Sequence, residues 1–145
     1  MTEGASSFWH LRCDGGARGN PGPGAFGFVL IDPHGAEIEA RGEYLGPVTN
    51  NVAEYRGLIA GLEAASKHGV RALEVNLDSE LVVRQMTGQY RVKNGGLKPL
   101  HQAACAAAER IDVIRFVSVR REENARADAI VNQTLDRVLG TESPR

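Results

Sequence analysis

The sequence predicts an α/β fold in which a mixed β-sheet is packed against helices. In the first segment apolar and polar residues alternate strictly, which is the pattern of a half-buried strand. Later segments carry apolar residues at the spacing of helices, and Gly- or Pro-containing turns separate the elements. The predicted order is β-β-β-α-β-α-α-β-α, without internal repeats or linkers.

The first three elements are predicted to form an antiparallel meander. Residues 8–14 alternate between apolar and polar side chains, and residues 25–31 follow a Gly/Pro-rich stretch as the second strand. After the turn at 32–35, residues 36–46 return as the third strand. The glycines and prolines before the second strand indicate a tight connection.

The remaining elements alternate between helix and strand. In the first helix the apolar side chains recur at helical spacing, and Gly69 closes it. The expected elements are a helix over 49–69, a strand over 72–78, a helix over 79–88, a helix over 97–112, a strand over 113–119 and a helix over 125–140.

Composition limits the function classes. The chain has 145 residues, 42% hydrophobic and 24% charged, with a net charge of −1. These values are typical of one globular domain and argue against a surface that grips nucleic acid over its whole extent. We expect a domain over 8–140, with disordered ends at 1–7 and 141–145. The lack of a signal peptide, of a membrane-length apolar run and of paired cysteines favours the cytoplasm.

The Gly-rich stretch formally matches a dinucleotide-binding loop. Residues 22–27 read G-x-G-x-x-G. That motif holds a pyrophosphate only when it opens a helix. Here a predicted strand follows and no helix begins for about two dozen residues, so the sequence context excludes a dinucleotide site.

Four acidic residues stand at the ends of predicted elements, and each has a simple structural explanation. Asp14 can start a turn, and Asn51 with Glu54 can form a capping box. Asp78 can cap the following helix, and Asp128 suits a helix N-terminus. The alternative is that all four converge, because clusters of Asp and Glu bind hard cations such as Mg²⁺.

Four stretches of the chain resemble the type 1 ribonucleases H, which cut the RNA strand of RNA–DNA hybrids. The resemblance covers the chain from about Phe8 to Leu139. The matching stretches are "DGGARGNPGPGAFGFVL", "TNNVAEYRGLIAGLEAA", "LDSELVVRQMTG" with "YRVKN", and "REENARADAIVN". The resemblance implies a ribonuclease H-like fold, a five-stranded mixed sheet in which three antiparallel strands are continued by parallel ones, flanked by helices.

The resemblance also implies the chemistry. It assigns metal binding and catalysis to Asp14, Glu54, Asp78 and Asp128, with two Mg²⁺ ions per site, for which Mn²⁺ can substitute. Asp14 and Asp78 would be shared near both metals, and Glu54 would hold the second metal beside the RNA 2′-hydroxyl. Asp128 would help to hold the metal that activates water. Hydrolysis would leave 5′-phosphate and 3′-hydroxyl ends.

Substrate contacts are implied by the same resemblance. Thr49 and Asn50 match a pocket for a DNA phosphate, and turn and cap roles remain the alternative for such residues. The residues matched to RNA-strand recognition or further substrate binding are Asn20, Asn50, Asn51, Ser79, Glu80, Lys93 and Asn94.

The sequence departs from the family pattern in two places. Many members carry a histidine just before the fourth carboxylate, where this chain has Arg121. This residue is the expected stand-in, and a solvated arginine is the alternative. Longer relatives insert a basic protrusion, where this chain offers only Arg91, Lys93 and Lys98, which predicts weaker hybrid binding with a shallower salt dependence.

The predicted function is therefore hydrolysis of RNA in RNA–DNA hybrids by a monomer without membrane association. Two alternatives remain open. One is a broader nuclease that also cuts double-stranded RNA, and the other is a catalytically weak hybrid-binding module.

Overall fold

The structure, a computed structural model, describes residues 7–140 of the chain. The expectations for residues 1–6 and 141–145 lie outside the described residues. The described chain forms one five-stranded sheet in the order β3-β2-β1-β4-β5. The elements are β1 (Trp9–Ala17), β2 (Gly22–Ile31), β3 (Glu37–Val48), α2 (Asn50–Lys67), β4 (Ala72–Leu77), α3 (Glu80–Met86), α4 (Lys98–Ala108), β5 (Val113–Ser118), the 3₁₀ turn η1 (Arg121–Asn124) and α5 (Ala125–Leu139).

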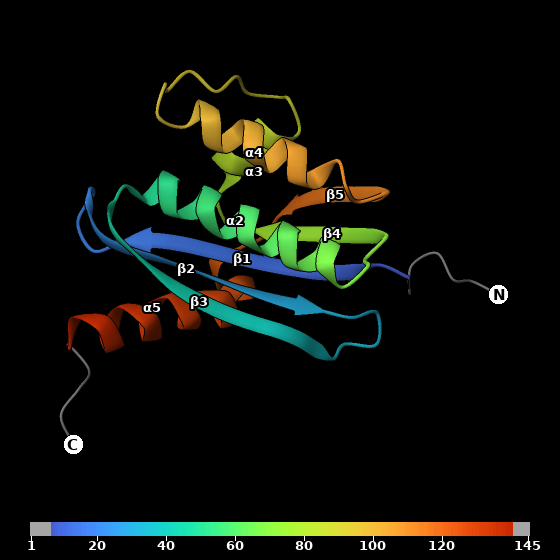
Figure 1. Ribbon diagram of the computed structural model, residues 1–145, viewed down its shortest axis with the longest axis horizontal. Helices are drawn as coiled ribbons and strands as arrows, with labels where there is room; N and C mark the ends of the chain where they lie inside the picture. The colour runs from blue at the N-terminus through green and yellow to red at the C-terminus, as the bar shows by residue number, and fades with distance from the viewer. Residues whose placement is uncertain (1–6, 141–145) are drawn as a thin grey trace.

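The strand pairing confirms the expected mixed sheet. β1 pairs antiparallel with β2, and β2 pairs antiparallel with β3. On its other side β1 pairs parallel with β4, which pairs parallel with β5. Because β1 and β4 run the same way, their carboxyl ends reach the same edge of the sheet (Figure 1).

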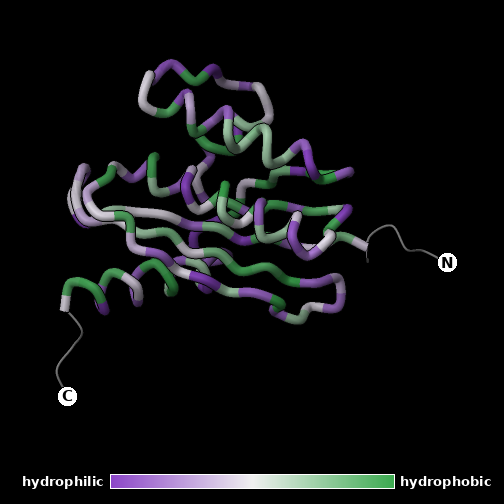
Figure 2. Tube along the Cα trace, viewed as in Figure 1, coloured by the Kyte–Doolittle hydropathy of each residue, from purple (hydrophilic) through white to green (hydrophobic). Residues whose placement is uncertain are grey.

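Helices cover both faces of the sheet. α2, α3 and α4 lie on one side, and α5 lies on the other under β2 and β3 (Figure 1). Along β2, Phe26 and Phe28 join the core beneath α2, while a Cβ at Gly27 would touch Ile130 of α5. The green segments in the central strands of Figure 2 show that hydrophobic residues are concentrated there.

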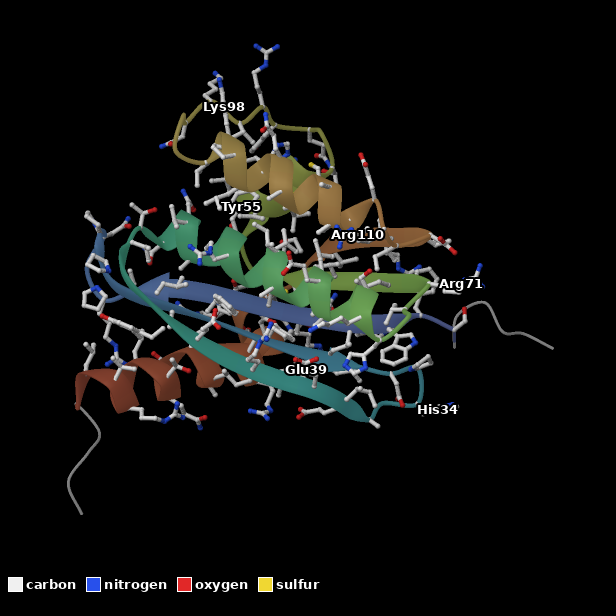
Figure 3. All side chains as sticks on the ribbon, in the orientation of Figure 1. His34, Glu39, Tyr55, Arg71, Lys98 and Arg110 are labelled. Carbon is white, nitrogen blue, oxygen red and sulfur yellow. The ribbon has the colours of Figure 1, made fainter. Side chains whose placement is uncertain are left out.

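A buried hydrogen bond joins α2 to α3. The hydroxyl of Tyr55 on α2 donates to Gln85 Oε1 on α3 over 2.6 Å. Figure 3 labels Tyr55 on the side of α2 that faces α4. The helical layer is therefore fastened by a polar contact as well as by apolar packing.

The Gly-rich connection is shorter than the sequence indicates. β1 continues through Gly15 and Gly16 to Ala17, and β2 already begins at Gly22. A Cβ at Gly15 would overlap the backbone of Ala53 on α2. The first two glycines thus belong to the strand, and at Gly15 only a glycine fits because α2 lies directly on it.

The sequence predicts that the chain has no apolar run long enough to span a membrane. Between residues 7 and 140, no helix has both the length and the apolar character needed to cross a bilayer.

Gly15→Ala should lower the free energy of unfolding by about 1–3 kcal/mol, the usual cost of overpacking a well-packed core. The added methyl group would collide with the Ala53 backbone, which cannot move without shifting α2. Urea unfolding measures the change. Gly95→Ala is the matched control, since a Cβ there meets nothing within 4 Å. Equal stability of the two variants would contradict the close contact.

Candidate functional site

Two of the acidic residues meet at the carboxyl ends of neighbouring strands. Asp14 lies near the end of β1, and Asp78 directly follows β4. The parallel register pairs Arg12 with Asn76, two residues before each acid. Ligand sites of open α/β sheets form at such carboxyl ends. The parallel pairing of β1 with β4 therefore brings Asp14 and Asp78 together, which the sequence alone did not establish.

α2 adds Glu54 to the same place. A Cβ at Gly57 would press on the Asp14 carbonyl oxygen at 3.0 Å, so only a glycine lets the helix lie this close to β1. The expected capping box of Asn51 with Glu54 is wrong, because the cap is Thr49, whose Oγ1 accepts from Val52 N at 3.2 Å. Glu54 is only 9% exposed and lies on the inner face of the helix.

The second cap expectation is also wrong. The residue that caps α3 is Ser79, whose Oγ accepts from Val82 N at 3.3 Å. Asp78 precedes the cap and lines the cavity described below. Its carboxylate is therefore available for another role.

A buried amide brings the last acidic residue to the site. Asn124, which is fully buried, donates from Nδ2 to the carbonyl oxygen of Cys13 over 2.8 Å. This bond docks η1 beside the strand position that precedes Asp14. α5 starts immediately afterwards and carries Asp128 in its first turn, while Arg121 begins η1.

These side chains line one cavity of about 550 Å³. Its walls come from β1, the start of α2, the end of β4, η1 and α5. The lining residues are Asp14, Gly15, Gly16, Ala17, Arg18, Asn50, Glu54, Asp78, Ser79, Arg121, Asp128, Val131, Asn132 and Leu135.

The donor set fits a divalent cation. Among the described residues, Asp14, Glu54 and Asp78 each offer a carboxylate oxygen, and these oxygens lie within 4.8 Å of one another. Glu54 Oε1 is buried without a hydrogen-bond partner in the described part of the chain. Hard cations such as Mg²⁺ prefer carboxylate oxygens. A cation would supply the partner that this oxygen lacks, and Asp128 lines the same cavity just outside the tight trio.

The buried carboxylates oppose one another electrostatically. Burial, followed by the neighbouring charges of Asp78 and Asp128, raises the pKa of Asp14 to about 8. Burial, then Asp14 and Asp78, raises the pKa of Glu54 well above its usual range. Burial also raises the pKa of Asp78, although the Arg121 guanidinium lowers it. Without a cation, the cluster therefore favours protons over full ionisation.

Three of the expected substrate residues lie where the β1–β2 turn meets α2. The backbone nitrogen of Asn50 donates to Asn20 Oδ1 over 2.9 Å, and Asn50 Oδ1 accepts from the backbone nitrogen of Ala17 at 2.8 Å. Thr49 caps the helix next to them. Asn50 lines the cavity, and Asn20 is joined to it through this bond.

The other expected substrate residues are divided. Ser79 lines the cavity, whereas Glu80 forms an ion pair with Arg84 Nη2 at 2.6 Å. Lys93 lines a separate hollow with Tyr90, and Asn94 Oδ1 accepts from the Gly96 amide at 2.7 Å. Asn51 follows Asn50 in the first turn of α2. The cavity thus collects only some of the side chains that the resemblance assigns to substrate.

Two polar residues that the sequence analysis did not single out also line the cavity. They are Arg18, in the turn between β1 and β2, and Asn132 on α5. Each lies within a stretch that matches the family, but nothing local distinguishes it from a solvated side chain. Arg18 lies only four residues after Asp14, but this spacing alone does not predict that its side chain reaches the cavity.

The sequence is similar over most of its length to several known proteins. A protein-family model described as reverse transcriptase-like matches residues 12–134. A bifunctional protein of Mycobacterium tuberculosis is 39% identical over 92% of this chain and 41% of its own length. A ribonuclease HI of Halobacterium salinarum is 40% identical, covering 88% of this chain and 64% of the relative. The chain thus spans less than two thirds of these two proteins. A ribonuclease H of Hydrogenovibrio crunogenus is 35% identical, over 90% of this chain and 97% of the relative.

Solved structures agree with these likenesses. The N-terminal RNase H domain of a Mycobacterium tuberculosis protein superposes with a TM-score of 0.89 at 39% identity, over 94% of this chain and 99% of that domain's chain. An RNase H1 isolated from compost, solved in complex with an RNA/DNA hybrid, gives a TM-score of 0.85 at 43% identity, over 90% and 99% of the two chains.

The metal-free protein should lose stability as the pH rises from about 4 to about 8. Because folding raises the pKa of Asp14 from 3.8 to about 8, the native state binds more protons than the unfolded chain in this range. The free energy of unfolding then falls with rising pH. Asp14→Asn removes the group, so its stability advantage over wild type should grow with pH and exceed about 1 kcal/mol near pH 8.

Thermal unfolding in EDTA across this pH range measures the difference. Adding a divalent cation at pH 8 should raise the midpoint of wild type and leave that of Asp14→Asn nearly unchanged. Asp112→Asn is the control, because Asp112 is an exposed acid paired with Arg71. An Asp14→Asn advantage that is constant with pH would contradict the electrostatic argument.

Proposed function

Because the chain belongs to the ribonuclease H family, we propose that it is an endoribonuclease that hydrolyses the RNA strand of RNA–DNA hybrids. The observation that carries the proposal is the group of buried carboxylates of Asp14, Glu54 and Asp78 in one open cavity. A surface that only binds a polyanion would gain nothing from buried negative charge beside the phosphates. The proposed products have 5′-phosphate and 3′-hydroxyl ends.

The proposed cofactor is a pair of Mg²⁺ ions, for which Mn²⁺ can substitute. When bound, such ions lower the pKa of the attacking water and stabilise the leaving oxygen. The chain's own contribution is to hold the ligands in place. Asp14 and Asp78, on adjacent parallel strands, are the proposed shared ligands, with Glu54 and Asp128 completing the set on opposite sides of them.

Arg121 is proposed to steady the scissile phosphate. It lines the cavity, and its charge acts on the neighbouring Asp78. A guanidinium stays charged at neutral pH, so it can bind phosphate oxygens but cannot relay a proton. At the position where many family members carry a histidine, Arg121 is therefore limited to charge stabilisation.

The turn and helix start beside the cavity are proposed to distinguish the two strands of the hybrid. Asn20 and Asn50, which are hydrogen bonded to each other, can face the RNA 2′-hydroxyl, the group that separates RNA from DNA. The Thr49 hydroxyl with the backbone amides at the start of α2 suits a DNA phosphate. Ser79, and less directly Asn51, Glu80, Lys93 and Asn94, complete the proposed substrate-binding set.

Hybrid binding is proposed to depend on few cations. The segment between α3 and α4 carries only Arg91 and Lys93, and Lys98 begins α4. Figure 3 shows Lys98 at the outer side of α4, away from the sheet. We therefore place the weight of phosphate binding on the residues around the cavity. We propose that the protein is a cytoplasmic monomer, in keeping with its two free cysteines.

Wild type should cleave the RNA of a labelled hybrid in Mg²⁺ or Mn²⁺, and Asp78→Asn should reduce the rate at least about 100-fold, since it removes a charge from the metal-binding trio. Denaturing gels of RNA–DNA hybrid, double-stranded RNA and double-stranded DNA measure cleavage. Asp112→Asn should retain full activity.

The outcomes separate the alternatives. Cleavage of hybrid but not of double-stranded RNA supports the narrow activity, and cleavage of both indicates the broader nuclease. Hybrid binding without cleavage in either metal would leave only the binding module. Equal rates in wild type and Asp78→Asn would reject the assigned site.

Arg121→Ala should lower kcat on hybrid about 100- to 1,000-fold, the range expected when one donor to a developing negative charge is lost. Arg121→Lys should recover part of the rate because a positive charge remains. Arg120→Ala is the matched control, since Arg120 is exposed and faces Glu122 and Glu123. If the rate of Arg121→Ala equals that of wild type, Arg121 is a solvated side chain without a role in cleavage.

A further inference from the structure

Arg18 is a cavity residue that the proposed mechanism does not use. It lies in the turn between β1 and β2, and its side chain is 36% exposed. Its Nη2 atom lies 2.7 Å from Asp136 Oδ1 and 3.5 Å from the carbonyl oxygen of Asn132. The turn is thereby joined to α5, the helix that carries Asp128.

These contacts fix the position of the guanidinium along α5. Asn132 and Asp136 follow Asp128 by one and two helical turns, or about 6 and 12 Å along the axis. Asn132 also donates from Nδ2 to the carbonyl oxygen of Asp128 over 3.1 Å. The guanidinium therefore lies beyond Asp128 along the cavity wall, within the distance that a few phosphates of one strand span.

The charges that line the cavity indicate what Arg18 can bind. Four carboxylates line it, and the basic side chains among the lining residues are Arg18 and Arg121. Arg121 acts on Asp78, whereas Arg18 contacts the later turns of α5. A nucleic-acid strand crossing the cavity would meet one cation near the carboxylates and the other further along α5.

We propose that Arg18 binds a non-scissile phosphate of the RNA strand and so sets the position of that strand relative to the carboxylates. The inference rests on the proposed function and adds a substrate contact to it. Arginine suits the task, because its planar fork offers several donors and can grip phosphate while a carboxylate holds its other edge. Asp136 serves as that carboxylate.

The ion pair alone does not account for Arg18. Pairs between half-exposed side chains contribute little to stability, about 0–1 kcal/mol. Asp136 is similarly exposed, at 34%. The pair keeps a long flexible side chain at the cavity rim, which lowers the entropy cost of binding a phosphate there.

The salt dependence of hybrid binding tests the contact directly. In the Asp78→Asn background, which should not cut the substrate, fluorescence anisotropy gives Kd over a series of KCl concentrations at constant Mg²⁺. Adding Arg18→Met should raise Kd several-fold and reduce the slope of log K against log salt by about 0.9, the value for one lost phosphate contact. Adding Arg18→Lys should restore most of the slope.

Arg126→Met is the matched control. Arg126 lies on α5, the helix that Arg18 contacts, and like Arg18 it forms an ion pair, with Glu37 at 3.1 Å, but it does not line the cavity. Its substitution should leave the slope unchanged. Thermal unfolding midpoints of all variants separate a loss of folding from a loss of contact.

The results distinguish the inference from the function on which it rests. If the background protein binds hybrid and Arg18→Met leaves its slope unchanged, the phosphate contact is rejected and the nuclease stands. If no variant binds hybrid and wild type does not cut it, the proposed function itself fails. A hybrid with neutral methylphosphonate linkages in its DNA strand tests the choice of strand. The effect of Arg18→Met should persist there, and its disappearance would overturn the assignment to RNA.

Discussion

The close contact between α2 and β1 is the constraint on which the site depends. Gly15 on the strand and Gly57 on the helix lack side chains at the points where the two backbones meet. This contact sets Glu54 opposite Asp14 in the interior, where neither could be brought by a flexible loop with the same accuracy. A Cβ at either glycine would push the helix outward and withdraw one carboxylate from the others. The glycine that seemed to belong to a turn is thus a packing residue of the site.

Stability and function make opposite demands on this contact. Burial of apolar side chains on one face of β1 and on both faces of β2 supplies the favourable free energy that holds the sheet together. The same burial removes water from Asp14 and Glu54 and raises their pKa values. A cluster that resists ionisation is a poor stabiliser but a strong cation ligand set, since a divalent ion removes the repulsion when it binds. Sites of this kind are commonly retained at a cost in stability.

The sequence was sufficient to predict the helices and strands but not the contacts between them. Alternation and helical spacing are local, and they predicted the strands and helices with small errors at the ends. The capping role given to Asn51 was wrong because Thr49 caps the helix, which therefore starts two residues earlier than a cap at Asn51 would give. The parallel pairing of β1 with β4 joins residues more than sixty positions apart, so no local pattern reveals it. The resemblance supplied the four carboxylates, but only the packing explains why they meet.

The contacts and charge environment of Arg18 also could not be predicted from the sequence. Its contacts on α5 lie 114 and 118 positions away, at Asn132 and Asp136, and an overall charge of −1 gives no hint of a cation at the cavity rim. Divalent ions favour ionisation of the four carboxylates that line the cavity, and the bound ions then offset the negative charge that would otherwise repel phosphate. For the proposed nuclease, metal affinity and hybrid affinity should then increase each other by the same factor, because linkage between two bound groups is reciprocal. A near-neutral chain can in this way bind a polyanion at one place while the rest of its surface stays indifferent to it.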